Sequence, residues 1–275
     1  MSEMQTAYQL AALAVRERFA EQHPEDLAVL DRIESGDVAA YSGSFDQAEE
    51  ALRCLGIPTT INPQANSLTA KIVFINCSSS YDTKLIEEIG RYVEAGKWLV
   101  TSDWALHYII ERVFPDTVRW TRQSTGDEVI SVEPNLDSFW SETVVLGADP
   151  QWWLWGSYPI EVLNREKVSI EAASHNLLVR YNAPVVAVRF DWGKGQVFHV
   201  ISHFWAKRSG TPTVRHTGPC TDFLKVGMRL SDKGIEKVLN EAKIEPSSVN
   251  FAMIQSAATA MELIAQLCVR AMRSS

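Results

Sequence analysis

The sequence predicts an α/β fold in which helices flank a parallel sheet, with an added β-hairpin region and an insertion before the last helix. In the first half of the chain, short apolar runs alternate with amphipathic helical segments, which is typical of βαβ units. The run Ala70–Ile75 is almost continuously apolar, as expected for a strand buried on both faces of a parallel sheet. With 46% hydrophobic and 22% charged residues, the 275-residue chain has an ordinary globular composition.

The first elements are predicted from periodicity and stop signals. Apolar residues at helical spacing predict a helix over residues 7–22. The apolar run 37–42 and the β-branched run 57–61 predict strands on either side of a helix over 46–55, which Gly56 ends. We therefore expect the unit strand, turn, helix, strand.

The next unit is clearer. Strand 70–75 is followed by a helix over 83–95, with Asp82 as its N-cap, and then by strand 97–101 and a helix over 104–113. Connections of this kind are almost always right-handed and place successive strands parallel in one sheet. We therefore expect the strands 37–42, 57–61, 70–75 and 97–101 to lie parallel, with both helices on the faces of their sheet.

The pattern changes after Pro115. Asp191-Trp192-Gly193-Lys194-Gly195 predicts a hairpin turn between strands 184–190 and 196–202. A helix capped by Ser231 or Asp232 ends near Lys243, and the last helix covers about 250–272. Shorter strands are predicted at 118–121, 129–132, 168–170 and 177–181, the first two around the turn Thr125-Gly126-Asp127.

Composition and charge exclude several classes of protein. A net charge of -8 argues against a nucleic-acid-binding protein. Polar residues interrupt both the N-terminal segment and the apolar run 251–272, so we expect neither a signal peptide nor a membrane span. The four cysteines form no C-x-x-C pair, so we expect a reduced, cytoplasmic protein without a metal or another cofactor. His199 and His203 are too far apart along a strand to share one metal ion.

The order of these elements is accompanied by short segments of recognisable sequence. They are Lys71–Ser80, Tyr92–Val100, Thr101–Ala105, Trp192–His199 and Ser202–His203. Together they resemble the class I glutamine amidotransferase-like superfamily, including its ThuA-like, non-amidotransferase branch. The resemblance implies a flavodoxin-like parallel sheet flanked by helices and an α/β core over residues 35–205. A helical segment, 1–34, precedes this core. A basic loop plus helix, 206–247, is inserted before a C-terminal helix, 248–275, that packs back on the core.

The resemblance also shows what the chain lacks. In that superfamily a cysteine nucleophile stands at the elbow between a strand and a helix, and here Asp103 falls at that position. His203 matches the superfamily's histidine, whereas Trp205 replaces the acid two residues later. A carboxylate is far less nucleophilic than a thiolate, so the chain is not expected to be a glutamine amidotransferase. No glycine flanks Ser102, so the strained turn of a nucleophile elbow is not indicated.

The turns at one edge of the sheet hold the candidate site. Ligands of open α/β sheets bind at the carboxyl ends of the strands. We expect Asp103 and His203 to lie close together there; a simpler interpretation is that Asp103 caps the following helix. Likewise, Cys77 is either a pocket residue or a small buried thiol. The candidate pocket consists of Ser44, Cys77, Ser78, Ser102, Asp103, Trp104 and His203.

Two functions follow from these residues. The first is a non-catalytic, amidotransferase-like module that binds a protein partner, a second copy of itself or a small polar ligand. Residues 206–247 carry eight Lys and Arg against five Asp and Glu and are either a lid or docking surface, or a solvated loop. The alternative is a hydrolase or other small-molecule enzyme that uses Asp103 and His203. The run Trp152-Trp153-Leu154-Trp155 is interpreted as packing, with an aromatic platform as the alternative.

Overall fold

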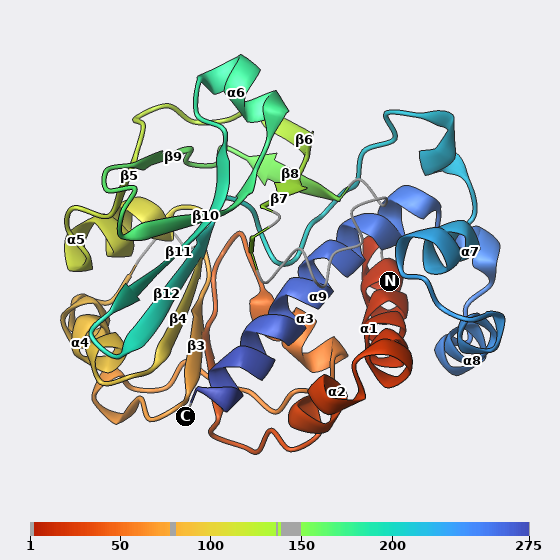
Figure 1. Cartoon of the computed structure of the whole chain (residues 1–275), viewed down its shortest axis with the longest axis horizontal. Coiled ribbons are helices and arrows are strands. Elements are labelled where there is room, and N and C mark those ends of the chain that lie inside the picture. Colours follow the sequence, from red (N-terminus) through yellow and green to blue (C-terminus); the bar gives the residue numbers. More distant parts are fainter. Residues whose placement is uncertain (1–2, 78–80, 136, 139–149, 275) are drawn as a thin grey trace.

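The computed structural model describes residues 3–77, 81–135, 137–138 and 150–274. Within them, one sheet has the strand order β2-β1-β3-β4-β12-β11-β10-β7, with β9 and β5 attached beside β11 (Figure 1). The strands are β1 (Val38–Tyr41), β2 (Thr60–Ile61), β3 (Ile72–Ile75), β4 (Trp98–Ser102), β5 (Val118–Trp120), β7 (Glu133–Pro134), β9 (Ile160–Val162), β10 (Val168–Ala173), β11 (Val185–Trp192) and β12 (Gly195–Val200). A separate two-stranded sheet pairs β6 (Asp127–Ser131) with β8 (Gln151–Trp155).

The central part of the large sheet is parallel. β2, β1, β3, β4 and β12 are neighbours in that order and all pair in parallel. In this register Phe74 of β3 lies opposite Val100 of β4, and Val100 lies opposite Phe198 of β12. All three side chains are completely buried, which explains why these strands read as apolar runs. The predicted parallel arrangement of the first four strands is confirmed, as is an α/β fold with a mostly parallel sheet flanked by helices.

The remaining strands of the large sheet are antiparallel. The predicted hairpin is present as β11 and β12, which pair from Ala187↔Val200 to Trp192↔Gly195. The strands predicted near 118–121 and 129–132 exist as β5 and β6, but β5 pairs with β9 and β6 pairs with β8. The turn at Thr125-Gly126-Asp127 therefore does not join a hairpin.

The strand predicted at 177–181 is wrong. These residues belong to helix α6 (His175–Tyr181), which ends at Asn182 with a φ of 52°. Leu177 is the buried side chain of this helix, whereas Leu178 and Val179 are exposed. The apolar run therefore has the pattern of a buried strand, although only part of it is buried. Asn182 adopts the left-handed conformation that often follows the last residue of a helix.

The helices form layers on the two sides of the sheet. Figure 1 shows α4 (Thr83–Glu94) on one side and α1 (Glu3–Gln22), α3 (Ala48–Cys54) and α9 (Phe251–Arg273) on the other. Asp82 caps α4 as predicted, with its side chain accepting the Lys84 N–H at 3.0 Å. The helix predicted over 104–113 is a π-helical stretch, Leu106–Ile110, that continues into α5 (Glu111–Val113). The others are α2 (Pro24–Leu30), α7 (Cys220–Asp222) and α8 (Asp232–Ala242).

The last helix belongs to the core. Asn250 caps α9 by accepting the Met253 N–H, and α9 packs against α1, α2 and α3. It is long and apolar enough to cross a membrane, yet 94% of its most apolar window is buried inside the protein, as in the core helix of a soluble domain. Ser231 caps α8, one of the two residues predicted to do so. The division at residues 34, 205 and 247 stays a prediction.

Candidate functional site

Asp103 stands at a strained turn between β4 and the π-helical stretch. Its φ is 45°, in the left-handed region that non-glycine residues rarely adopt. Its N–H donates to the carbonyl of Val200 at 2.8 Å, which ties the turn to the end of β12. The turn is thus strained although no flanking glycine indicated it. Backbone strain of this kind costs on the order of 1–3 kcal/mol and is concentrated at functional sites.

The carboxylate of Asp103 does not cap the following helix, so that interpretation is also wrong. Oδ1 accepts the backbone N–H of Tyr158 at 2.9 Å, and Oδ2 accepts the hydroxyl of Ser157 at 3.2 Å. The left-handed backbone turns the side chain away from the helix and toward the loop between β8 and β9. Asp103 therefore joins the parallel part of the sheet to this loop.

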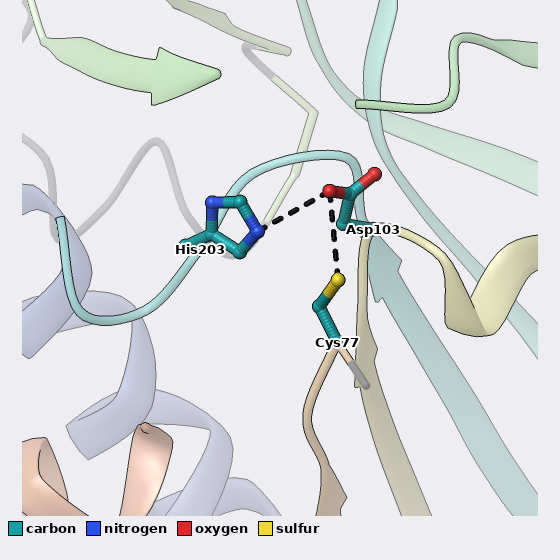
Figure 2. Close-up of side chains that lie close together, drawn as sticks. All are labelled: Cys77, Asp103 and His203. Atoms are coloured by element: carbon teal, nitrogen blue, oxygen red, sulfur yellow. Dashed lines mark hydrogen bonds and ion pairs between the residues drawn. The ribbon is translucent and has the colours of Figure 1, made fainter. Parts of the chain in front are cut away.

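His203 follows β12 and faces Asp103. Its Nε2 lies 3.2 Å from Asp103 Oδ2, and both residues are completely buried (Figure 2). The imidazole ring lies against the indole of Trp153, with ring centroids 5.4 Å apart. The His203 carbonyl accepts the indole N–H of Trp152 at 3.0 Å. The expected proximity of Asp103 and His203 is thus present without a bridging water.

Cys77 follows β3 and completes the cluster. Its Sγ is 3.7 Å from Asp103 Oδ2, and the nearby backbone N–H of Trp104 acts to lower the pKa of the thiol. The backbone N–H of Cys77 in turn donates to Ser102 Oγ at 2.9 Å. Cys77 is 1% exposed. Residues from the ends of three neighbouring strands therefore meet at one point, as the topology of a parallel sheet requires.

The other predicted pocket residues lie at different places. Ser102 is buried and holds the Cys77 loop as described, whereas Ser44 is exposed. Trp104 is half-buried, stacks on Tyr158 with ring centroids 5.5 Å apart, and donates from its indole to the carbonyl of Gly156. Ser78 lies outside the described residues.

Sequence reasoning missed Asp46, Ser157 and Tyr158. Asp46 is completely buried, and its Oδ1 accepts the backbone N–H of Trp205 at 3.0 Å. Its negative charge acts on both His203 and Cys77. A carboxylate distant in sequence therefore lies near the histidine, while Trp205 stacks on Tyr8. An acidic residue at the start of the helix predicted after the first strand was the available signal for Asp46.

Burial governs the protonation of the cluster. It raises the pKa of the Asp103 carboxyl above its ordinary value, although His203 and the Tyr158 N–H oppose this effect. Burial lowers the pKa of His203, but contact with the Asp103 carboxylate outweighs it, so that this pKa lies above its ordinary value. Burial and the Asp103 charge also raise the pKa of the Cys77 thiol, which is consequently not nucleophilic.

The tryptophan run is mainly packing. Trp152 and Trp153 are buried, whereas Trp155 is 44% exposed and carries the Lys207 ammonium over its ring at 5.2 Å. Only the last tryptophan of the run therefore presents a large surface to solvent.

No family model and no curated protein matches the chain. Among solved structures, a carbohydrate deacetylase is 18% identical, covers 62% of this chain and 30% of its own, and has a TM-score of 0.46. A β-galactosidase from Bacillus circulans is 14% identical, with coverages of 81% and 34% and a TM-score of 0.44. A ThuA-like protein from Bacteroides uniformis is 9% identical, with coverages of 60% and 80% and a TM-score of 0.43. The chain spans about a third of the length of the first two. At this distance the likeness concerns the fold and assigns no activity.

Proposed function

We propose that the chain is a non-catalytic module of the amidotransferase-like, ThuA-like type, which binds a protein partner or a small polar ligand. One observation carries the proposal. Acyl-transfer elbows stabilise an oxyanion with the backbone N–H of the residue after the nucleophile, together with an N–H from a neighbouring loop. Here the N–H of Cys77 donates to Ser102 Oγ at 2.9 Å, and the N–H of Trp104 faces Cys77 Sγ closely enough to lower the pKa of the thiol. Both N–H groups therefore face groups of the protein itself.

The protonation state of the cluster supports the same proposal. The cysteine is a protonated thiol rather than a nucleophile, and His203 is held by Asp103 rather than free to act as a base. A general base must reach the proton that it removes. In this conformation His203 and Asp103 are completely buried. The pair consequently joins the end of β12 to the elbow.

Exposed apolar side chains in the insertion support a binding role. Val214 is 88% exposed and Val226 is 57% exposed. The start of the insertion lies over the small sheet, where Arg208 forms an ion pair with Asp127 at 2.8 Å. This arrangement places a basic segment beside Trp155, as a docking surface for an acidic partner requires.

Capture from native lysate with the tagged full-length chain, followed by mass spectrometry, tests the partner. We expect a stoichiometric partner with the wild type and with His175→Gln, which changes an exposed histidine. Val214→Ser/Val226→Ser is expected to lose that partner at an unchanged unfolding midpoint. For a small ligand, thermal shift against polar metabolites is the corresponding measurement. The proposal fails if the chain captures no partner and no compound raises its midpoint.

A hydrolase is the second candidate, and the strained backbone of Asp103 is the observation that favours it. In such an enzyme the Asp103 carboxylate attacks the carbonyl carbon of an ester or the anomeric carbon of a glycoside and expels the alcohol. Water activated by His203 then hydrolyses the acyl- or glycosyl-aspartate, which releases the acid or sugar and restores the carboxylate. Turnover of aryl esters or aryl glycosides by the wild type, lost in Asp103→Asn, would establish it in place of the first proposal.

A further inference from the structure

Cys77, Asp103 and His203 present three different ligand types to one point. Figure 2 shows their side chains directed toward one another from the end of β3, from the elbow after β4 and from the segment after β12. One ligand atom from each residue lies within 4.8 Å of the other two. Oδ2 of Asp103 is 3.7 Å from Cys77 Sγ and 3.2 Å from His203 Nε2.

These separations fit ligands of one metal ion. Zinc binds sulfur at about 2.3 Å and nitrogen or oxygen at about 2.0–2.2 Å, usually with tetrahedral geometry. Ligand atoms around such an ion are consequently about 3.3–3.7 Å apart. Both measured distances lie close to this range, so an ion between the three atoms needs only small adjustments of the side chains.

Polar atoms around the cluster are buried without hydrogen bonds. Among the described residues, neither ring nitrogen of His203 meets hydrogen-bond geometry, although Nε2 faces Asp103. Asp46 Oδ2 is also buried without a hydrogen-bond partner there. Buried polar groups are almost always satisfied, and an ion is one of the few explanations for an exception. Two buried carboxylates near one imidazole also favour a cation.

Further hydrogen bonds hold the ligands in place. Ser157 and Tyr158 donate to the two oxygens of Asp103, and the N–H of Cys77 donates to Ser102 Oγ. Such outer hydrogen bonds orient metal ligands and are a regular part of metal sites. The carboxylate is thereby fixed with Oδ2 toward the sulfur and the imidazole.

We propose that Cys77, Asp103 and His203 bind one divalent transition-metal ion of the zinc type. A thiolate, an imidazole and a carboxylate together suit zinc, whereas magnesium and calcium prefer oxygen ligands alone. Three protein ligands leave a fourth position for a donor atom from elsewhere. The inference deepens the proposed function and rests on it: the donor comes from the small polar ligand, whose binding must open the cluster, because its three residues are buried in this conformation.

The full chain, freed of metal with a chelator and titrated with Zn²⁺ or Co²⁺, tests the inference. We expect one ion per chain by elemental analysis after gel filtration. The Co²⁺ form is expected to show strong tetrahedral ligand-field bands and a thiolate-to-cobalt charge-transfer band. Cys77→Ser abolishes the charge-transfer band, and His203→Gln or Asp103→Asn weakens binding at least tenfold. Circular dichroism of each metal-free variant checks that it is folded.

A second cluster provides the control. His23, Glu25 and Asp26 also hold ligand atoms within 4.8 Å, but near the start of α2. His23→Gln/Glu25→Gln should leave the stoichiometry and the cobalt spectrum unchanged. The inference is overturned if the wild type binds no ion, or if the ion survives in the folded Cys77 and His203 variants.

These outcomes are separate from those of the proposed function. Partner or ligand binding by a chain that takes no ion overturns the metal site alone. A stoichiometric ion combined with hydrolysis that depends on Asp103 overturns the non-catalytic role and leaves the metal site standing.

Discussion

Arg18 of α1 and Glu262 of α9 form an ion pair inside the protein, with 5% and 6% of their side chains exposed. The two residues are 244 positions apart in the chain. Burial raises the pKa of the Glu262 carboxyl, and the Arg18 charge opposes that effect. The pair therefore joins the first helix to the last at a point where an isolated charge would be costly.

Breaking this pair should destabilise the protein strongly. Glu262→Gln removes the negative charge that faces the buried Arg18 guanidinium, so we expect the free energy of unfolding to fall by about 3–5 kcal/mol. Arg18→Met/Glu262→Leu should cost less than Glu262→Gln alone, because no buried charge remains. Arg91→Ala, which breaks an exposed pair with Glu88, should leave the free energy of unfolding almost unchanged. Urea unfolding of the variants measures these differences, and equal losses at both pairs would contradict the argument.

Leu267 tests whether α9 belongs to the core. It is completely buried, so Leu267→Ala is expected to lower the free energy of unfolding by about 2–5 kcal/mol. Met272→Ala, on the same helix but half-buried, should have a smaller effect. The midpoint of thermal unfolding measures both, and an unchanged midpoint for Leu267→Ala would mean that the helix is peripheral.

Gly43 lies too close to the Cys77 loop for any side chain. A Cβ at this position would overlap with the carbonyl oxygen of Cys77 and come within 2.8 Å of the Asn76 Cβ. Gly43→Ala must therefore displace the loop that holds Cys77, and we expect a loss of about 1–3 kcal/mol. Gly126→Ala is the matched control, because nothing there lies nearer than 3.9 Å. Equal unfolding midpoints for the two variants would contradict this prediction, because they would show that the Cys77 loop can move without loss of stability.

The parallel half of the fold could be predicted from the sequence because its strands are buried on both faces. The run Ile72–Ile75 is apolar at every position, so its assignment did not depend on distant residues. The cluster was partly predictable for a related reason: turns that follow parallel strands share one edge of the sheet, which brought Cys77 and Asp103 together.

The rest depends on contacts that no local pattern contains. Ser157 and Tyr158 reach Asp103 from a loop about 55 residues away. The left-handed backbone of Asp103 comes from this tertiary environment, since no glycine marks the turn. The strand predicted at residues 177–181 was wrong because part of this apolar run is exposed. Local sequence cannot distinguish a buried from an exposed apolar run.

His199 should make the protein sensitive to acid. It is completely buried, with Nδ1 2.8 Å from Thr101 Oγ1, and burial lowers its pKa from 6.5 to about 3. The folded state therefore favours neutral imidazole. This contribution to stability is complete above pH 6.5 and is lost as the pH falls toward 3, because the unfolded chain then binds one more proton.

The expected slope from this residue is about 1.4 kcal/mol per pH unit between those two pKa values. His199→Leu removes it, so the difference in unfolding free energy between variant and wild type should shrink as the pH falls. His175→Gln changes an exposed histidine and should leave the slope as it is. Urea unfolding across this pH range measures the slopes, and identical slopes for wild type and His199→Leu would refute the assignment.

Because the turn after β4 carries Asp103, we expect the protein to have no glutaminase activity. Amide transfer from glutamine requires a thiolate that forms a thioester, and the resemblance to the amidotransferase-like superfamily implies that Asp103 occupies the position of that thiolate. Cys77 does not replace it, because burial and the Asp103 charge raise the pKa of its thiol and keep it protonated. We therefore expect purified protein to release no ammonia from glutamine above a control without enzyme. Ammonia release that disappears in Asp103→Ala would show that the carboxylate is catalytic after all, whereas release that disappears in Cys77→Ser would show that the thiol ionises during turnover.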